Sequence, residues 1–261
     1  MNVNNLNLGE HVKFDVKKRF GIITLNRPEK ANALTLEMLK DLKKVIDHCQ
    51  QAENIRGILL TGNGNSFTTG MDMRSIDASN HEMAFEYERI ASEIAFSLFS
   101  GKPVICAING KAMGDGVAYA LCSDYRLAVK ETYFQMPEIK TGIFPGAGTI
   151  VIMTRVLGIP WTKRILMFAE KIPAEKALEI GLIDHIVDSK EELIKIALEK
   201  ARFLFTKNQV VLNGIKLCTN YLIDKSISKG YELEKQFLKD WVERNEKNDV
   251  VKRFREKIIN F

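Results

Sequence analysis

Short apolar runs alternate with longer amphipathic stretches in the first half of the chain, and this alternation most restricts the fold. Residues 21–25, 57–61 and 103–108 are continuous apolar runs of strand length. Between them, the stretch after Thr35 and residues 80–100 repeat apolar side chains at the spacing of one helix face. Continuous apolar strands separated by helices are typical of a parallel sheet buried on both faces. The pattern therefore predicts an α/β fold, with Thr35 as the N-cap of its first long helix.

Helical patterns dominate from about residue 160 onward. The helix-like stretches there are rich in Lys and Glu and cover residues 174–182, 190–206, 208–229 and 230–247. No low-complexity linker separates them from the first half of the chain. We therefore expect a core of residues 1–195 and a helical oligomerisation region of residues 196–261, without independent domains.

The composition excludes several other classes of protein. With 261 residues, of which 46% are hydrophobic and 27% charged, the chain is neither disordered nor fibrous. The net charge of +5 comes from 38 basic and 33 acidic residues that are interspersed, so we expect no nucleic acid as a partner, whereas a phosphate-bearing small molecule fits. The four cysteines form no C-x-x-C pair, and no apolar stretch reaches the ~18 residues of a membrane span. We expect a cytoplasmic protein without a membrane partner.

Two glycine-bearing loops have the form of ligand-binding turns. Residues 62–73 and 107–116 each follow a strand-like run, and the second loop leads into an apolar helix. The free N–H groups at such a helix start suit an oxyanion or a phosphate. Neither loop contains a G-x-G-x-x-G or P-loop motif, which disfavours nucleotide binding by those routes. An ordinary surface turn is the alternative interpretation of the first loop.

A third loop places a carboxyl group among apolar residues. Glu138 lies close in the sequence to Phe134, Ile139, Ile143 and Phe144. A carboxyl group held among such side chains would have a raised pKa, as a proton-transferring base requires. A solvated loop glutamate is the alternative.

These loops and two further segments, in this order, resemble the crotonase (enoyl-CoA hydratase/isomerase) superfamily. The matching segments are residues 26–34 (NRPEKANAL), 66–73 (SFTTGMDM), 107–116 with 123–124, 134–138 with 142–148, and 174–183 (AEKALEIGLI). They resemble, in turn, the family's adenine-side coenzyme A segment, its two oxyanion-hole loops, its catalytic-glutamate segment and its A-x-x-A-x-x-x-G-L-V-(D/N) signature. The resemblance extends from about residue 12 to the C-terminus.

The resemblance implies a fold, a substrate and an assembly. The fold is a crotonase-like spiral of ββα units that holds the coenzyme A and catalytic site in residues 1–195, followed by a C-terminal helical trimerisation region. The substrate is an acyl-CoA thioester. Coenzyme A is part of that substrate, and no metal or other cofactor is implied. The expected assembly is a homotrimer or a homohexamer.

It also implies roles for individual residues. Glu138 is the expected catalytic base, and the N–H groups of Met71 and Asp115 are expected to hold the thioester oxygen as it becomes an enolate. An oxyanion donor of this kind is worth roughly 3–4 kcal/mol of the reaction barrier. The residues expected to bind substrate are Lys30, Ala31, Ala33, Gly70, Asp72, Met73, Gly114, Gly116, Ala118, Pro137, Phe254 and Lys257, the last two in a terminal F-x-x-K element that often approaches the coenzyme A of a neighbouring subunit.

Two positions lack carboxylates that relatives carry. Hydratases of the family have a second glutamate where this chain has Ala118, and Gly146 stands where some relatives have an acidic residue. Hydration suits two carboxylates, whereas moving a double bond needs one base that takes a proton from C2 and returns it to C4. We therefore expect an enoyl-CoA isomerase. The alternatives are a hydratase, decarboxylase or thioesterase on the same scaffold, and a non-catalytic CoA-binding homologue.

Asp115 also departs from the family pattern, which usually has Gly at this position. Two like charges ~4 Å apart repel by about 4 kcal/mol at an effective dielectric constant of about 20, so an ionised carboxylate beside an enolate is unfavourable. The side chain points away from the substrate, or is protonated and donates a hydrogen bond, or replaces the missing second acid. The sequence leaves these three possibilities open.

Overall fold

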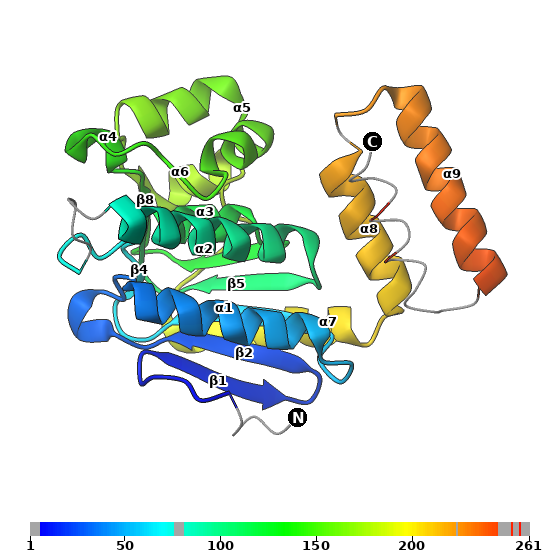
Figure 1. The fold of residues 1–261 in the computed structure, drawn as a ribbon, viewed down its shortest axis with the longest axis horizontal. Coiled ribbons are helices and arrows are strands. Elements are labelled where there is room, and N and C mark those ends of the chain that lie inside the picture. Colours follow the sequence, from blue (N-terminus) through cyan, green and yellow to red (C-terminus); the bar gives the residue numbers. More distant parts are fainter. Residues whose placement is uncertain (1–5, 76–80, 223, 245–251, 253–255, 257–261) are drawn as a thin grey trace.

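The computed structural model describes residues 6–75, 81–222, 224–244, 252 and 256. The strands are β1 (Val12–Lys17), β2 (Phe20–Leu25), β3 (Gly57–Gly62), β4 (Ser66–Thr68), β5 (Val104–Ile108), β6 (Lys111–Met113), β7 (Tyr125–Val129), β8 (Tyr133–Gln135), β9 (Ile172–Pro173) and β10 (His185–Val187). The helices are α1 (Leu36–Gln51), α2 (His81–Ser100), α3 (Asp115–Leu121), α4 (Glu138–Thr141), α5 (Thr149–Met167), α6 (Ala174–Glu179), α7 (Lys190–Phe205), α8 (Gln209–Tyr221) and α9 (Ile227–Arg244), with a short 3-10 helix at Pro28–Lys30. Strands and helices alternate along the chain, which confirms the predicted α/β fold (Figure 1).

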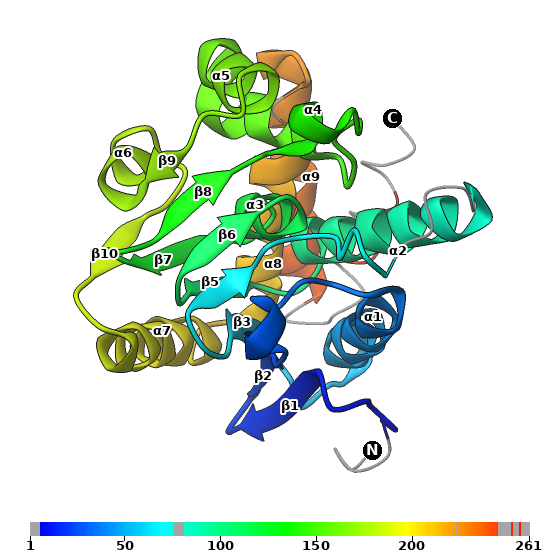
Figure 2. The ribbon, with the colours of Figure 1, turned by 90° about the vertical axis from the view of Figure 1, so that its left-hand side faces the viewer.

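Two sheets share these strands. The larger sheet has the order β1-β2-β3-β5-β7-β10, and the smaller has the order β4-β6-β8-β9. The pairs β1–β2 and β8–β9 are antiparallel, and the other neighbours are parallel. Consecutive strands β3 and β4, β5 and β6, and β7 and β8 each contribute first to the larger sheet and then to the smaller, and a helix follows each pair. This repetition winds the chain into a spiral of ββα units (Figure 2).

Helices cover both faces of the larger sheet, which explains its continuous apolar strands. In β3, Ile58 and Leu60 belong to the cluster that includes the buried face of α1, whereas Leu59 packs with α7. Alternate residues of a strand face opposite sides of a sheet, so apolar layers on both faces require an uninterrupted apolar run. Helix α1 begins where expected, because the Thr35 side chain accepts a hydrogen bond from the N–H of Met38.

The smaller sheet brings the three loops together. Strands β4, β6 and β8 are parallel neighbours, so their C-terminal ends lie at one edge of that sheet. The residues that follow these ends include Gly70, Gly114 and Glu138, one from each loop. The order of three very short strands therefore assembles the candidate site.

The C-terminal half differs from the expectation in two ways. Strand β10 joins the larger sheet beside β7, and α7 packs on that sheet over Leu193, Ala197, Ala201 and Phe205, so the expected boundary at residues 195/196 falls inside a core helix. The single helix expected over residues 208–229 is wrong, because α8 ends at Tyr221 and α9 begins at Ile227. The oxygen of the Ser226 side chain accepts a hydrogen bond from the Lys229 N–H, in the way that capping residues start a helix.

Helices α8 and α9 form a pair beside the two sheets (Figure 1). They have their own apolar cluster of Val210, Leu217, Leu222 and Leu233. Among the helices whose residues the structure describes, none combines the length with the hydropathy of a membrane span.

Candidate active site

Two glycines allow the first two loops to approach each other. Gly70 has a φ of +78°, and a Cβ atom there would lie 3.0 Å from the Met113 carbonyl oxygen and 3.2 Å from the Asp115 nitrogen. Gly114 has a φ of +52°, and a Cβ atom there would lie 3.5 Å from the Gly70 Cα and 3.1 Å from Oε1 of Glu138. A side chain at either position would strain the backbone and crowd these neighbours. The glycines therefore set the spacing of the site.

The backbone N–H groups of Met71 and Asp115 are left free by this arrangement. Leu34 pairs with the residues on either side of Met71, because its N–H donates to the Gly70 carbonyl (2.8 Å) and its carbonyl accepts from the Asp72 N–H (2.9 Å). The Met71 N–H consequently points to the side opposite Leu34. Asp115 is the first residue of α3, where an N–H has no partner within the helix. Neither N–H donates a hydrogen bond within the described part of the chain, so the pair is available to an oxyanion.

Glu138 begins α4 and directs its carboxyl group towards Gly114. Its Oε2 atom is buried and has no hydrogen-bond partner among the described residues. Burial raises the pKa of Glu138 to about 7; a backbone hydrogen bond opposes this rise, and the Asp115 carboxyl adds to it. A carboxyl group with a pKa near neutrality is suited to take up and return a proton.

The apolar residues expected around Glu138 contribute unequally. Phe134 is 1% exposed, but Ile139 and Phe144 are 55% and 80% exposed. The pKa of Glu138 is raised as predicted, whereas Ile139 and Phe144 are mainly exposed to solvent. The carboxyl group is instead buried against Gly114, at the edge of the smaller sheet.

The Asp115 carboxyl group is held from α2. The Tyr87 hydroxyl donates a hydrogen bond to Oδ2 of Asp115 at 2.6 Å. Burial raises the pKa of Asp115 to about 6; the Tyr87 hydrogen bond opposes this rise, and the Glu88 carboxylate adds to it. Tyr119 lies one turn further along α3, fully buried, and its hydroxyl has no hydrogen-bond partner among the described residues. The carboxyl group thus lies between α3 and α2, near enough to Glu138 to affect its pKa.

Glu88 connects α2 to the turn before α5. Its Oε1 atom accepts hydrogen bonds from the Ala147 N–H (2.8 Å) and the Ser92 hydroxyl (2.7 Å). A Cβ atom on Gly146 would collide with the Glu88 carboxylate. Glu88 thus places a carboxylate from another helix where a side chain at Gly146 would begin. The sequence gives no sign of this contact, because the hydrogen-bonded residues are 59 positions apart.

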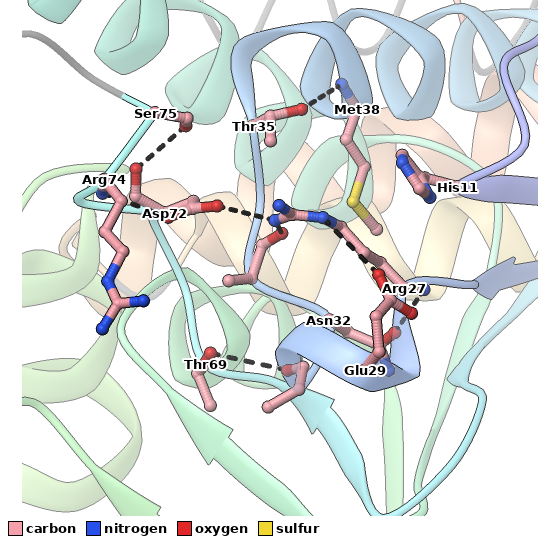
Figure 3. Close-up of polar contacts among 12 residues, drawn as sticks. His11, Arg27, Glu29, Asn32, Thr35, Met38, Thr69, Asp72, Arg74 and Ser75 are labelled. Carbon is pink, nitrogen blue, oxygen red and sulfur yellow. Dashed lines mark hydrogen bonds and ion pairs between the residues drawn. The ribbon is translucent and has the colours of Figure 1, made fainter.

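The segment of residues 27–34 is fastened to the first loop (Figure 3). The Arg27 guanidinium donates to the Asp72 carboxylate at 2.7 Å and to the Ala33 carbonyl at 3.0 Å. Asn32 is fully buried; it accepts the Arg27 N–H and donates to the Ser66 carbonyl. Burial opposes ionisation of Asp72, but hydrogen bonds from Arg27 and from the backbone outweigh it and lower the pKa. These contacts hold the loop that carries Met71.

The other residues expected to bind substrate differ in accessibility. Lys30 and Met73 are exposed, Ala31, Ala33 and Pro137 are half-buried, and Gly116 and Ala118 are buried. Ala118 thus leaves no carboxylate at the position of the second glutamate that hydratases of the family carry. Phe254 and Lys257 lie outside the described residues. Tyr87 and Glu88 of α2 lie near the site but are not among the residues that the sequence predicts there.

Free N–H groups beside a carboxyl group of near-neutral pKa define the class of site. Such a site stabilises an oxyanion next to a carbon whose proton is moved by a carboxylate. Within the described ranges of the chain, no group of three His, Cys, Asp or Glu side chains is placed to hold a metal ion.

Comparisons with known proteins agree with this class. The sequence model of the enoyl-CoA hydratase/isomerase family matches residues 16–260, and the chain belongs to this family. It is 30% identical over 253 residues to YngF of Bacillus subtilis, provisionally named an enoyl-CoA hydratase/isomerase, with 96% of this chain and 97% of YngF covered. It is 31% identical over 233 residues to the 1,2-epoxyphenylacetyl-CoA isomerase of Escherichia coli, with 87% and 88% covered.

Solved structures show the same fold. The structure of an enoyl-CoA hydratase from Bacillus anthracis matches with a TM-score of 0.86 at 26% identity, over 95% of this chain and 97% of the other. The protein therefore has the crotonase fold.

Proposed function

We propose that the protein is an enoyl-CoA isomerase, which converts a 3-enoyl-CoA to a 2-enoyl-CoA through an enolate. The observation that carries this proposal is the Glu138 carboxyl group, with a pKa of about 7, beside Gly114 and the free N–H groups. Ala118 is fully buried and cannot transfer a proton. One suitably placed base is the minimum that the movement of a double bond requires.

The reaction begins with the thioester oxygen on the N–H groups of Met71 and Asp115. Ionised Glu138 removes a proton from C2, and the electrons of the broken C–H bond delocalise onto the thioester oxygen. Each N–H donor stabilises the resulting oxyanion by roughly 3–4 kcal/mol. A proton then returns at C4, and the double bond ends between C2 and C3. No atom is gained or lost overall.

The remaining parts of the proposal concern the substrate and the assembly. Coenzyme A enters as part of the substrate, with its adenine near residues 27–33, and no metal or other cofactor takes part. The assembly is a homotrimer or homohexamer formed through the helical region. In support, α8 and α9 expose large apolar side chains, at Ile215, Ile227, Tyr231, Leu238 and Val242.

A hydratase is the second candidate, and Asp115 is the observation that favours it. A partly buried carboxyl group with a pKa of about 6 near Glu138 would supply a second acid–base group. The relatives named above include an isomerase and a hydratase.

Product analysis tests the proposal. The purified protein is incubated separately with a 3-enoyl-CoA and a 2-enoyl-CoA of the same chain length, and the products are separated by chromatography. We expect isomerisation of the 3-enoyl-CoA to be faster than hydration of the 2-enoyl-CoA. Hydration of the 2-enoyl-CoA at a rate comparable to the isomerisation of the 3-enoyl-CoA would support a hydratase instead. No conversion of either substrate would indicate a non-catalytic homologue. The Glu138→Gln variant, purified in parallel, controls for contaminating enzymes.

A further inference from the structure

Asp115 combines a candidate oxyanion donor and a carboxyl group in one residue. Its N–H lies beside the first loop, since a Cβ atom on Gly70 would be 3.2 Å from the Asp115 nitrogen. The Asp side chain is short, so the carboxyl group stays close to any acyl group whose oxygen accepts that N–H. Glu138 reaches the same place from the third loop, with its Oε1 atom against Gly114. Two carboxyl groups therefore flank one candidate acyl position.

The hydrogen bonding of Asp115 distinguishes its two oxygen atoms. Oδ2 accepts the Tyr87 hydroxyl at 2.6 Å. Tyr87 is fully buried in α2, so its hydroxyl holds the carboxyl group in one orientation. Within the described part of the chain, the Asp115 carboxyl group has no other hydrogen bond, which leaves Oδ1 available to hold a proton and to release it.

The groups around Asp115 act on its proton in opposite directions: burial and Glu88 favour the protonated form, whereas the Tyr87 hydrogen bond favours the ionised form. On α2, the Tyr87 hydroxyl donates a hydrogen bond to Asp115, and the negatively charged Glu88 accepts the Ala147 N–H. The neutral Tyr119 lies on α3, and Glu138 lies on α4. The buried side chains of α5, which packs on α3, carry no ionisable group. With pKa values of about 6 for Asp115 and about 7 for Glu138, the two carboxyl groups together hold one proton between these pH values. That proton lies mainly on Glu138, and the reactive form is the minor one, in which the proton lies on Asp115 and Glu138 is ionised.

We propose that Asp115 is a second catalytic residue, which exchanges a proton with C4 of the acyl group while Glu138 exchanges one with C2, and that Tyr87 positions it. This inference rests on the isomerase proposed above. Ionised Glu138 takes the proton from C2, and the dienolate takes a proton at C4 from Oδ1 of Asp115. The C3–C4 double bond becomes a C2–C3 double bond. Glu138 ends protonated and Asp115 ionised, and exchange with water returns each to its starting state.

This division of roles also answers the objection to a carboxylate beside the enolate. In the reactive form Asp115 is neutral when the negative charge develops, so the two charges do not coexist at full strength. It becomes ionised only as the enolate is neutralised at C4. Glu88 contributes by favouring the protonated form of Asp115.

Isotope transfer separates this mechanism from one with a single base. A 3-enoyl-CoA deuterated at C2 is isomerised in ordinary water, and the product is analysed by mass spectrometry and NMR. We expect hydrogen from the solvent at C4 in the wild type.

The kinetics of a variant supply a second test. We expect Asp115→Asn to lower kcat at least ~10-fold with a nearly unchanged KM, because a general acid is lost while binding persists. Deuterium carried from C2 to C4 by the wild type, or a wild-type kcat in Asp115→Asn, would overturn the role of Asp115 and leave the isomerase intact. A wild type that does not isomerise at all would overturn the proposed function itself.

The pH profile supplies a readout that a purely structural role would not move. We expect kcat of the wild type to be greatest between about pH 6 and about pH 7, where the pair holds one proton. Tyr87→Phe removes a hydrogen bond that lowers the pKa of Asp115, so its maximum should move to higher pH. Glu88→Gln removes a charge that raises the same pKa, so its maximum should move to lower pH. Displacements of the two pH maxima in opposite directions support the proposal. Folded variants whose pH maxima coincide with that of the wild type refute it.

Discussion

The Arg27 guanidinium lies 2.7 Å from the Asp72 carboxylate and ties the segment of residues 27–34 to the loop that carries Met71. The two side chains are only 15% and 13% exposed, so water screens their attraction weakly. Removal of one charge would leave the other poorly hydrated and without a counter-charge, which costs more than the loss of a surface ion pair.

We therefore expect Asp72→Asn to lower the free energy of unfolding by about 1–3 kcal/mol at neutral pH. Asp188→Asn is the matched control, since Asp188 pairs with Lys130 at the surface with its side chain 84% exposed, and should change stability by less than about 1 kcal/mol. The pKa of Asp72 is lowered in the folded state, so the ion pair stabilises the fold above the ordinary carboxyl pKa and is lost as the pH falls through the lowered value. Urea denaturation at neutral and strongly acidic pH measures both effects, and a pH-independent difference would contradict this account.

Glu138→Gln should separate catalysis from stability. We expect kcat to fall at least ~100-fold, the lower range for loss of a general base, while an acyl-CoA still binds. Burial raises the pKa of Glu138 to about 7, so the folded state loses stability as the pH rises from the ordinary carboxyl pKa to that value. The variant should therefore be more stable than the wild type at pH 8, by about 1–2 kcal/mol because the group is partly solvated. Activity near that of the wild type would remove Glu138 from the mechanism.

Gly70 and Gly181 provide a matched pair for testing the candidate oxyanion site. Both have a φ of +78°, but a Cβ atom on Gly181 would meet no atom within 4 Å, whereas one on Gly70 would approach Met113 and Asp115. Both alanine variants should lose about 1–2 kcal/mol of stability from the left-handed backbone. Gly70→Ala alone should also lower kcat at least ~100-fold, as loss of an oxyanion donor does. Thermal melts followed by circular dichroism measure the change in stability, and steady-state kinetics measure the change in kcat. Equal kcat values in the two variants would show that Gly70 does not shape the candidate oxyanion site.

The parts of the site that the sequence predicted depend on local pattern. The apolar runs and the Thr35 cap locate the larger sheet and α1, because buried strands and helix starts depend mainly on neighbouring residues. The smaller sheet escaped prediction because β4, β6 and β8 have three residues each, too few to show a period. The roles of Tyr87 and Glu88 could not be predicted because their hydrogen-bond partners, Asp115 and Ala147, are remote in the chain. A contact of this kind depends on how whole elements pack.

A buried lysine attaches the helical region to the core. Lys216 of α8 has a side chain that is 5% exposed, and its ammonium group donates to the Asp124 carboxylate at 2.7 Å. It also donates to the carbonyls of Leu98, at 2.6 Å, and Lys102. The same Asp124 oxygen accepts the Val104 N–H at the start of β5, so the contact joins α8 to the larger sheet.

Lys216→Met should therefore lower the free energy of unfolding by about 3–5 kcal/mol, since it leaves the Asp124 carboxylate and two carbonyls without their donor. Methionine keeps most of the length and apolar contact of the lysine stem, so the loss reports the charge rather than the volume. In Lys216→Met with Asp124→Asn, the unpaired charge is also removed while an acceptor for the Val104 N–H remains, and we expect part of the stability to return. Urea denaturation of the wild type, both single variants and the double variant gives the coupling free energy. Additive losses in the double variant would show that α8 is held to the core by its apolar contacts and not by this ion pair.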